Sequence, residues 1–124
     1  KMEFGYGACL PSDYIPETSL RLEIYHRLGE LTTYEALEEI IKELEDRFGS
    51  IPDKVIWLYH MTRLRIFGQM HDMVLLKFEK TSLQAQRQLK DKTIEKKTVP
   101  LPSFDHPKHL EDYVCMMLKH QFKL

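Results

Sequence analysis

The segment that most constrains this chain runs from Ser50 to Met70. Ser50 is suited to cap a helix and Pro52 to open one. The residues that follow place apolar side chains on almost every face of such a helix: Val55, Ile56, Trp57, Leu58, Tyr59, Met61, Leu64, Ile66, Phe67 and Met70. A helix that is apolar on most faces is normally buried. We therefore expect residues 52–70 to form the central helix, with the rest of the chain packed around it.

A second helix is predicted over residues 34–48, where one stripe is apolar and the other faces are charged. The stripe consists of Tyr34, Leu37, Ile40, Ile41, Leu44 and Phe48. Thr32 or Thr33 can cap its start, and Gly49 suits a left-handed C-terminal cap. Two favourable ion pairs are expected at a spacing of four residues: Glu38 with Lys42, and Glu43 with Arg47.

The segment before that helix predicts one more helix and a short strand. Residues 3–9 alternate between apolar and polar positions, which is typical of a strand. Residues 10–16 carry two prolines and should form an extended connection. Pro16 is suited to lead into a helix that ends at Gly29, with apolar residues spaced by four at Leu20, Ile24 and Leu28.

The second half of the chain mixes predicted strands and helices. We expect a strand over Met73–Phe78, a short helix over 82–90 capped by Thr81 or Ser82, and an edge strand within residues 92–101. A last helix should start near Asp105 and Pro107, with a stripe of Leu110, Tyr113, Val114, Met117 and Leu118. The predicted fold is α+β: a helix-rich single domain with a small, mainly antiparallel sheet.

Composition limits the possible functions. A chain of 124 residues is expected to form one domain, and a net charge of −1 gives no overall field to attract nucleic acid or an anionic membrane. No apolar run approaches the ~18 residues of a membrane span, and the N-terminal residues lack the apolar core of a signal peptide. Cys9 and Cys115 are expected to be buried free thiols in a reducing cytoplasm.

The candidate chemical groups favour no enzyme. His106 and His109 could offer two imidazoles to zinc, but no third ligand is placed nearby. Cys115 with His109 or His120 invites a nucleophile–base interpretation, yet its apolar neighbours favour a structural thiol. The carboxylates of the second helix lie on a charged face, where solvation is the simpler interpretation. We expect no catalytic site and no metal site.

Basic residues leave one alternative open. Arg63 and Arg65 form one local group, and a longer one consists of Arg87, Lys90, Lys92, Lys96 and Lys97. Neither group has the glycine or aromatic interleaving of a known nucleic-acid motif. An accessory nucleic-acid-binding module that uses these residues is therefore the alternative to a protein-interaction domain.

A set of short motifs resembles one protein family. The motifs are Leu10-Pro11, Asp13 to Pro16, Arg21-Leu22, Tyr25, Arg27, Glu43-Leu44, Asp46 to Gly49, Pro52 and Leu64-Arg65. Together they resemble the C-terminal domain of the bacterial transcription-repair coupling factors (Mfd). The resemblance is good over about residues 8–79 and loose beyond them.

The resemblance implies a regulatory role within a longer protein. Members of this family are multidomain ATP-dependent DNA translocases, helicase-like ATP hydrolases that bind ATP and magnesium in their motor domains. They push stalled RNA polymerase off damaged DNA and recruit the repair protein UvrA in the bacterial cytoplasm. Residues 1–124 would be the C-terminal regulatory domain. It would be catalytically inert, have no cofactor and no membrane partner, and pack on a UvrB-like module so that the UvrA-binding surface is masked.

The resemblance also indicates which residues make the masking contact. In the family, charged residues at the end of the acidic helix are used, and they match Glu43, Asp46 and Arg47. Their spacing of three and four residues places all three side chains on one helix face, beside the apolar stripe. The chain departs from the family after the third helix. Between Met70 and Met73 there is almost no room for an expected two-stranded hairpin. Either the hairpin is shortened or residues are missing around 70–73, and the same two alternatives apply to residues 84–97.

Overall fold

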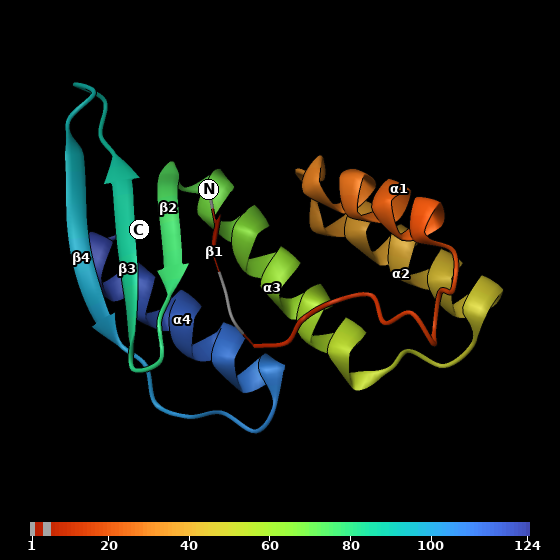
Figure 1. Ribbon diagram of the computed structural model, residues 1–124. Helices are drawn as coiled ribbons and strands as arrows, with labels where there is room; N and C mark the ends of the chain where they lie inside the picture. Colours follow the sequence, from red (N-terminus) through yellow and green to blue (C-terminus); the bar gives the residue numbers. More distant parts are fainter. Residues whose placement is uncertain (1, 4–5) are drawn as a thin grey trace.

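The computed structural model describes residues 2–3 and 6–124 and arranges them as helices around a small sheet (Figure 1). The elements are β1 (Met2–Glu3), α1 (Thr18–Gly29), α2 (Tyr34–Phe48), α3 (Asp53–Met70), β2 (Met73–Phe78), β3 (Ser82–Gln88), β4 (Ile94–Pro100) and α4 (Pro107–Phe122). Within these described residues, no helix is long and apolar enough to cross a bilayer.

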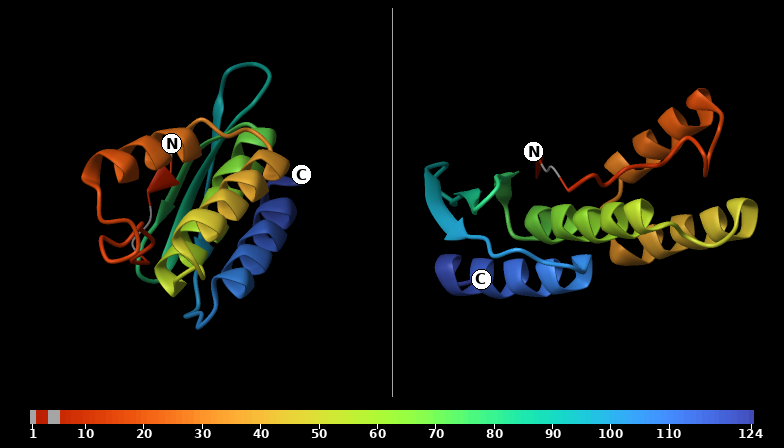
Figure 2. Two further views of the ribbon diagram at one scale, coloured as in Figure 1. Left: turned by 90° about the vertical axis from the view of Figure 1, so that its right-hand side faces the viewer. Right: turned by 60° about the horizontal axis from the view of Figure 1, so that its bottom comes forward.

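Helix α3 belongs to both hydrophobic clusters of the molecule. Its half nearer the sheet supplies Met61, Leu64 and Phe67 to a cluster with the sheet and α4. Val55 and Leu58 belong to a second cluster, formed with α1, α2 and the segment before α1. In the right-hand view of Figure 2, α3 lies between the sheet with α4 and the helices α1 and α2. The prediction of a central buried helix is confirmed.

The sheet has the strand order β1-β2-β3-β4, and β2, β3 and β4 pair antiparallel while β1 pairs parallel with β2. Helices α3 and α4 cover one face of this sheet (Figures 1 and 2). Gly68 lets α3 approach β2 closely, because a Cβ atom there would lie 3.1 Å from Leu76 Cδ1. The predicted fold class, α+β with a small and mainly antiparallel sheet, is confirmed.

The prediction of a helix over residues 82–90 is wrong, because Ser82–Gln88 forms strand β3. Glutamine and alanine favour strands weakly, so local propensity gave no signal for this strand. Leu83 and Ala85 nevertheless alternate with polar residues and point into the core, at 0% and 1% exposure. Pairing with β2 on one side and β4 on the other decides the conformation.

Two predictions about the first half also need correction. Strand β1 is only Met2–Glu3, and Tyr6 to Cys9 form no strand, while residues 4 and 5 of the predicted strand lie outside the described residues. Ser50 does not cap α3. Pro52 occupies the N-cap position without a side-chain hydrogen bond, and the helix begins at Asp53.

The predicted ends of the other helices agree well with the structure. Thr33 caps α2, where its side chain accepts a hydrogen bond from the Ala36 N–H. Gly49 ends the helix as predicted, but its φ of +91° and ψ of −165° lie outside the left-handed helical region that was expected for this cap. Helix α1 ends at Gly29 and α4 begins at Pro107. Helix α3 is joined to β2 by two residues only, and Asp72 adopts a positive φ of 62° in that connection.

Candidate functional site

The charged residues singled out by the sequence lie on the last two turns of α2. Glu43, Asp46 and Arg47 follow one another at three- and four-residue spacing, beside the buried Leu44. The end of this helix is held by Tyr14, whose hydroxyl donates to the Leu44 carbonyl at 3.2 Å and to the Gly49 carbonyl at 2.8 Å. A fixed helix end therefore positions the three side chains.

The segment before α1, which carries Tyr14, is itself fixed by burial and hydrogen bonds. Ile15 is fully buried, and the Arg21 guanidinium donates to its carbonyl at 2.5 Å. The Leu10 N–H donates to the Tyr25 hydroxyl at 2.6 Å. Several residues of the quoted motifs, Leu10, Tyr14, Ile15, Arg21 and Tyr25, thus have structural roles in folding.

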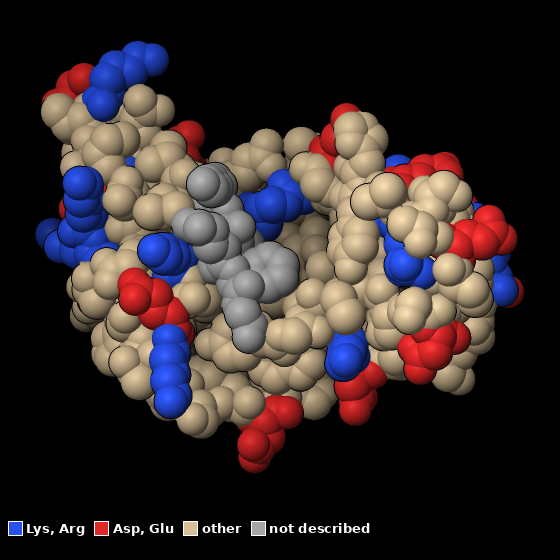
Figure 3. Space-filling view, viewed as in Figure 1, with Lys and Arg blue, Asp and Glu red and all other residues tan. Residues whose placement is uncertain are grey.

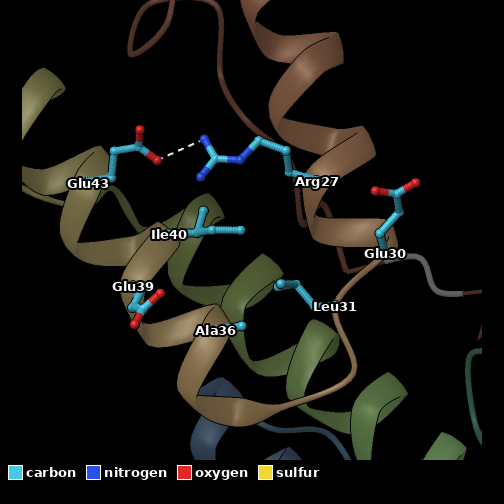
Figure 4. A pocket seen from close by; sticks show the side chains of 7 residues that line it. All are labelled: Arg27, Glu30, Leu31, Ala36, Glu39, Ile40 and Glu43. Carbon is cyan, nitrogen blue, oxygen red and sulfur yellow. Dashed lines mark ion pairs between the residues drawn. The ribbon is translucent and has the colours of Figure 1, made fainter.

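Glu43 is the one member of the charged trio with a close ion partner. Its carboxylate lies 2.8 Å from Arg27 Nη1 on α1 and 3.8 Å from Arg47 Nη1 (Figure 4). All three side chains are 37–48% exposed, so these pairs contribute at most about 1 kcal/mol each. Arg27 was named in the sequence only as part of a motif. No spacing rule could have paired it with a residue on another helix.

The charges of Asp46 and Arg47 have few partners within the described part of the chain. Asp46 is exposed and makes no ion pair or side-chain hydrogen bond within residues 2–3 and 6–124. Arg47 also lies over the Phe48 ring, 5.1 Å from its centroid. The end of α2 therefore presents Asp46, Arg47 and the exposed Glu45 to solvent beside the Glu43–Arg27 pair.

An open groove between α1 and α2 begins at Glu43. It has a volume of about 500 Å³ and is lined by Arg27, Glu30, Leu31, Ala36, Glu39, Ile40 and Glu43. Figure 4 shows Leu31, Ala36 and Ile40 between the two helices, with charged side chains around them. An apolar floor with a charged rim can accept the side chains of another polypeptide.

The other candidate groups have structural partners. The Cys115 thiol packs against the sheet-side cluster, and burial together with the nearby Glu111 carboxylate raises its pKa to about 12, so it is a poor nucleophile. The His106 ring accepts a hydrogen bond from the Lys108 N–H at the start of α4. Cys9 and Cys115 are free thiols, each only half-buried. The described residues contain no group of three or more potential metal ligands.

A polar junction between α2, α3 and α4 could not be predicted from spacing along the chain. The buried Glu111 carboxylate accepts hydrogen bonds from Arg63 Nε at 2.9–3.0 Å and lies 2.7 Å from His60 Nδ1. Arg63 also stacks on the Tyr34 ring, 4.3 Å from its centroid. Glu38 contacts Arg63 at 3.8 Å and accepts a hydrogen bond from the Tyr59 hydroxyl, so it does not form the predicted pair with Lys42.

Arg65 is also committed to the fold. Its Nη2 atom donates to the Leu28 carbonyl at 2.7 Å and to the Leu31 carbonyl at 3.0 Å, where α1 turns toward α2. Both arginines of the nucleic-acid alternative, Arg63 and Arg65, therefore have partners within the fold. Of the remaining lysines of the alternative, Lys96 and Lys97 lie on β4, and Lys90 and Lys92 lie in the turn between β3 and β4.

Replacing Arg65 with methionine should lower the free energy of unfolding by about 1–3 kcal/mol, because the Leu28 and Leu31 carbonyls, at and just after the end of α1, lose a charged donor. Urea unfolding measures the change. Arg47→Met is the matched control on the exposed end of α2 and should shift the value by less than about 0.5 kcal/mol. Equal losses for the two variants would contradict the structural role of Arg65.

Fold and site together define a small α+β domain in which α3 joins two cores and charged residues gather at the exposed end of α2. A family model described as the TRCF domain matches residues 4–98. The chain belongs to the TRCF domain family.

Proteins of similar sequence support this family assignment. A transcription-repair-coupling factor of Staphylococcus haemolyticus (strain JCSC1435) is 32% identical over 107 residues, covering 82% of this chain and 9% of that protein. That of Escherichia coli (strain K12) is 42% identical over 65 residues, covering 52% of this chain and 6% of that protein. The matched regions thus span less than a tenth of either relative.

A solved structure shares the fold. It is the crystal structure of the C-terminal domain of a transcription-repair coupling factor, with a TM-score of 0.65 and 23% sequence identity. The likeness covers 74% of this chain and 56% of that one.

Proposed function

We propose that this chain is the autoinhibitory C-terminal domain of a transcription-repair coupling factor. In this role it packs on a UvrB-like module of the same longer protein and masks the surface that UvrA would bind. The longer protein would carry the ATP- and magnesium-dependent motor, contact RNA polymerase and DNA through other domains, and work in the bacterial cytoplasm. The chain's family and the names of its relatives support this setting.

The observation that carries the proposal is the charge left over at the end of α2. Arg47 has one ion partner at 3.8 Å, and Asp46 has none in the described part of the chain. Tyr14 and the Gly49 turn hold that helix end in place. A positioned, exposed cluster of both charge signs suits specific recognition of a complementary surface.

A polar contact of this kind also suits an autoinhibitory interface that has to open. Exposed charge pairs contribute little affinity, whereas a tether to the partner module supplies a high effective concentration. The closed state can therefore be favoured by a weak interface. The groove between α1 and α2 would add apolar contacts next to Glu43.

Reversing the charges with Glu43→Lys and Asp46→Lys in the longer protein should raise UvrA capture roughly tenfold, because weakening the closed contact by about 1.4 kcal/mol shifts the equilibrium by that factor. Pull-down with immobilised UvrA measures the effect. The matched control is Glu23→Lys with Glu79→Lys, the same charge change at exposed sites away from the end of α2. UvrA capture equal to that of the unaltered protein, or an equal rise in the control, would refute the masking role of these residues.

A further inference from the structure

The segment that forms β2, β3 and β4 has a charge opposite to that of the rest of the chain. Residues 73–100 contain seven basic and three acidic residues, a net charge of +4, while the whole chain has −1. The basic residues are Lys77, Lys80, Arg87, Lys90, Lys92, Lys96 and Lys97. Such asymmetry between parts of one chain points to an anionic partner for the basic part.

Two of these lysines lie on the sheet face that α3 and α4 leave uncovered. Lys77 stands between the buried Leu76 and Phe78, so its side chain points away from the core. In the register Lys77 is level with Gln84, and Gln86 is level with Lys96, which places both lysines on the same face. From strand spacing and rise, Lys77 and Lys96 are about 12 Å apart.

Other lysines extend this face at both ends. Lys80 lies in the turn after β2, and Lys90 and Lys92 lie in the turn between β3 and β4. In Figure 3 this face is on the left, and Lys and Arg groups follow it from the tip of the β3–β4 turn downwards. The five lysines named here form what we call the lysine face, which spans roughly 20 Å along the strands.

The lysines of the lysine face make no close ion pairs within the described residues, although the exposed Glu79 lies next to Lys80 in the sequence. The nearby Asp91 carboxylate is used by the backbone N–H and hydroxyl of Thr93. Arg87, by contrast, is committed to the fold through the carbonyls of His71 and Phe122.

The outward positions of β2, β3 and β4 determine which anionic partner fits. They are mostly lysine, glutamine and threonine: Lys77, Gln84, Gln86, Gln88, Lys96 and Thr98. The apolar Ile94, 41% exposed and level with Gln88, lies at the end of this face next to the β3–β4 turn. Lysine is depleted in protein–protein interfaces, whereas protein–DNA interfaces are polar and strongly positive. Phe78 is the only aromatic residue between Met73 and Pro100 and it is buried, so β2, β3 and β4 themselves offer no ring to stack on unpaired bases.

We propose that the lysine face binds the phosphate backbone of double-stranded DNA without reading its sequence. The choice of DNA rests on the family, since both transcription and repair take place on duplex DNA. The lysine face shares no residue with the charged end of α2, so this inference is independent of the proposed masking role. Two to four phosphate contacts predict weak binding that falls roughly 10- to 100-fold between about 50 and 200 mM salt.

The test is fluorescence anisotropy of a labelled DNA duplex of about 20 base pairs, titrated with this chain at the two salt concentrations. Lys77→Glu with Lys96→Glu should weaken binding at low salt at least roughly tenfold and flatten the salt dependence. The matched control is Lys42→Glu with Lys54→Glu, the same charge change at exposed lysines of the helical part. It should weaken binding less than about threefold. Lys77→Gln with Lys96→Gln replaces the test variant if the latter unfolds.

Three outcomes would overturn the proposal. The first is no binding of the duplex at low salt. The second is an equal loss for the sheet variant and the helical control, which would mean that overall charge alone is responsible. The third is displacement of the duplex by polyglutamate as effectively as by unlabelled duplex, which would assign the lysine face to an acidic protein.

Discussion

Leu64→Ala is expected to lower the free energy of unfolding by about 2–5 kcal/mol, the largest effect we predict for a single substitution in this chain. Leu64 is fully buried on α3, in the cluster that joins this helix to the sheet and α4. Truncation removes apolar contacts and leaves a cavity that rigid neighbours cannot fill. Domains of this size have only about 5–15 kcal/mol of stability, so the variant should lose a large part of it.

Urea unfolding followed by circular dichroism measures this loss. Leu22→Ala on α1 is the control, because the Leu22 side chain is 63% exposed and packs in neither core cluster. Its effect should stay within about 0.5 kcal/mol. Similar losses for both leucines would contradict the central position of α3.

Glu111→Gln is expected to lower the free energy of unfolding by about 2–3 kcal/mol at pH 7, the second large effect. Glu111 is 8% exposed and is the acceptor for Arg63. A neutral amide in its place would leave the guanidinium without a counter-charge inside the α2–α3–α4 junction. Stacking on Tyr34 and partial exposure of Arg63 keep the loss below that of a fully buried pair.

The loss of stability caused by Glu111→Gln should depend on pH. Burial by itself would raise the pKa of this carboxyl, but hydrogen bonds and charge from His60 and Arg63 outweigh burial and hold the pKa below its ordinary 4.5. A carboxyl with a lowered pKa stabilises the fold above its unfolded pKa, and this contribution is lost as the pH falls through the folded value. The stability gap between the native chain and Glu111→Gln should therefore be full at pH 7 and shrink below about pH 4.5.

Unfolding midpoints of both proteins between about pH 7 and pH 3 measure that gap. Asp112→Asn is the matched control, because Asp112 neighbours Glu111 in sequence but forms an exposed pair with Lys108. It should change stability by less than about 0.5 kcal/mol at pH 7. A Glu111 gap that stays constant down to pH 3 would contradict the stated direction of the pKa shift.

Much of the helical part was predictable because its signals are local. Thr33 and Gly49 bound α2 through chemistry that acts within one turn of the chain. The apolar residues of α3 predict its burial because no other arrangement removes so many faces of one helix from water. The strand β3 could not be recognised in the same way, since the partners that stabilise it lie in β2 and β4.

In the candidate site, too, contacts within one helix were predictable and contacts between helices were not. Spacing on one helix was enough to place Glu43, Asp46 and Arg47 on one face and to predict the contact between Glu43 and Arg47. Arg27, which lies closest to Glu43, comes from another helix, and spacing cannot reveal a contact across helices. For the same reason Arg63 and Arg65 were candidates for nucleic acid until their carboxylate and carbonyl partners were known.

By itself the sequence determined the helices, the central position of α3, the α+β class and the charged face of α2, because capping and periodicity act between near neighbours. Only the tertiary structure decided that residues 82–88 form a strand and that Glu111 is the buried partner of Arg63. It also decided which lysines share the open sheet face. These features depend on strand register and on contacts between distant residues, which become defined only when the whole chain has packed.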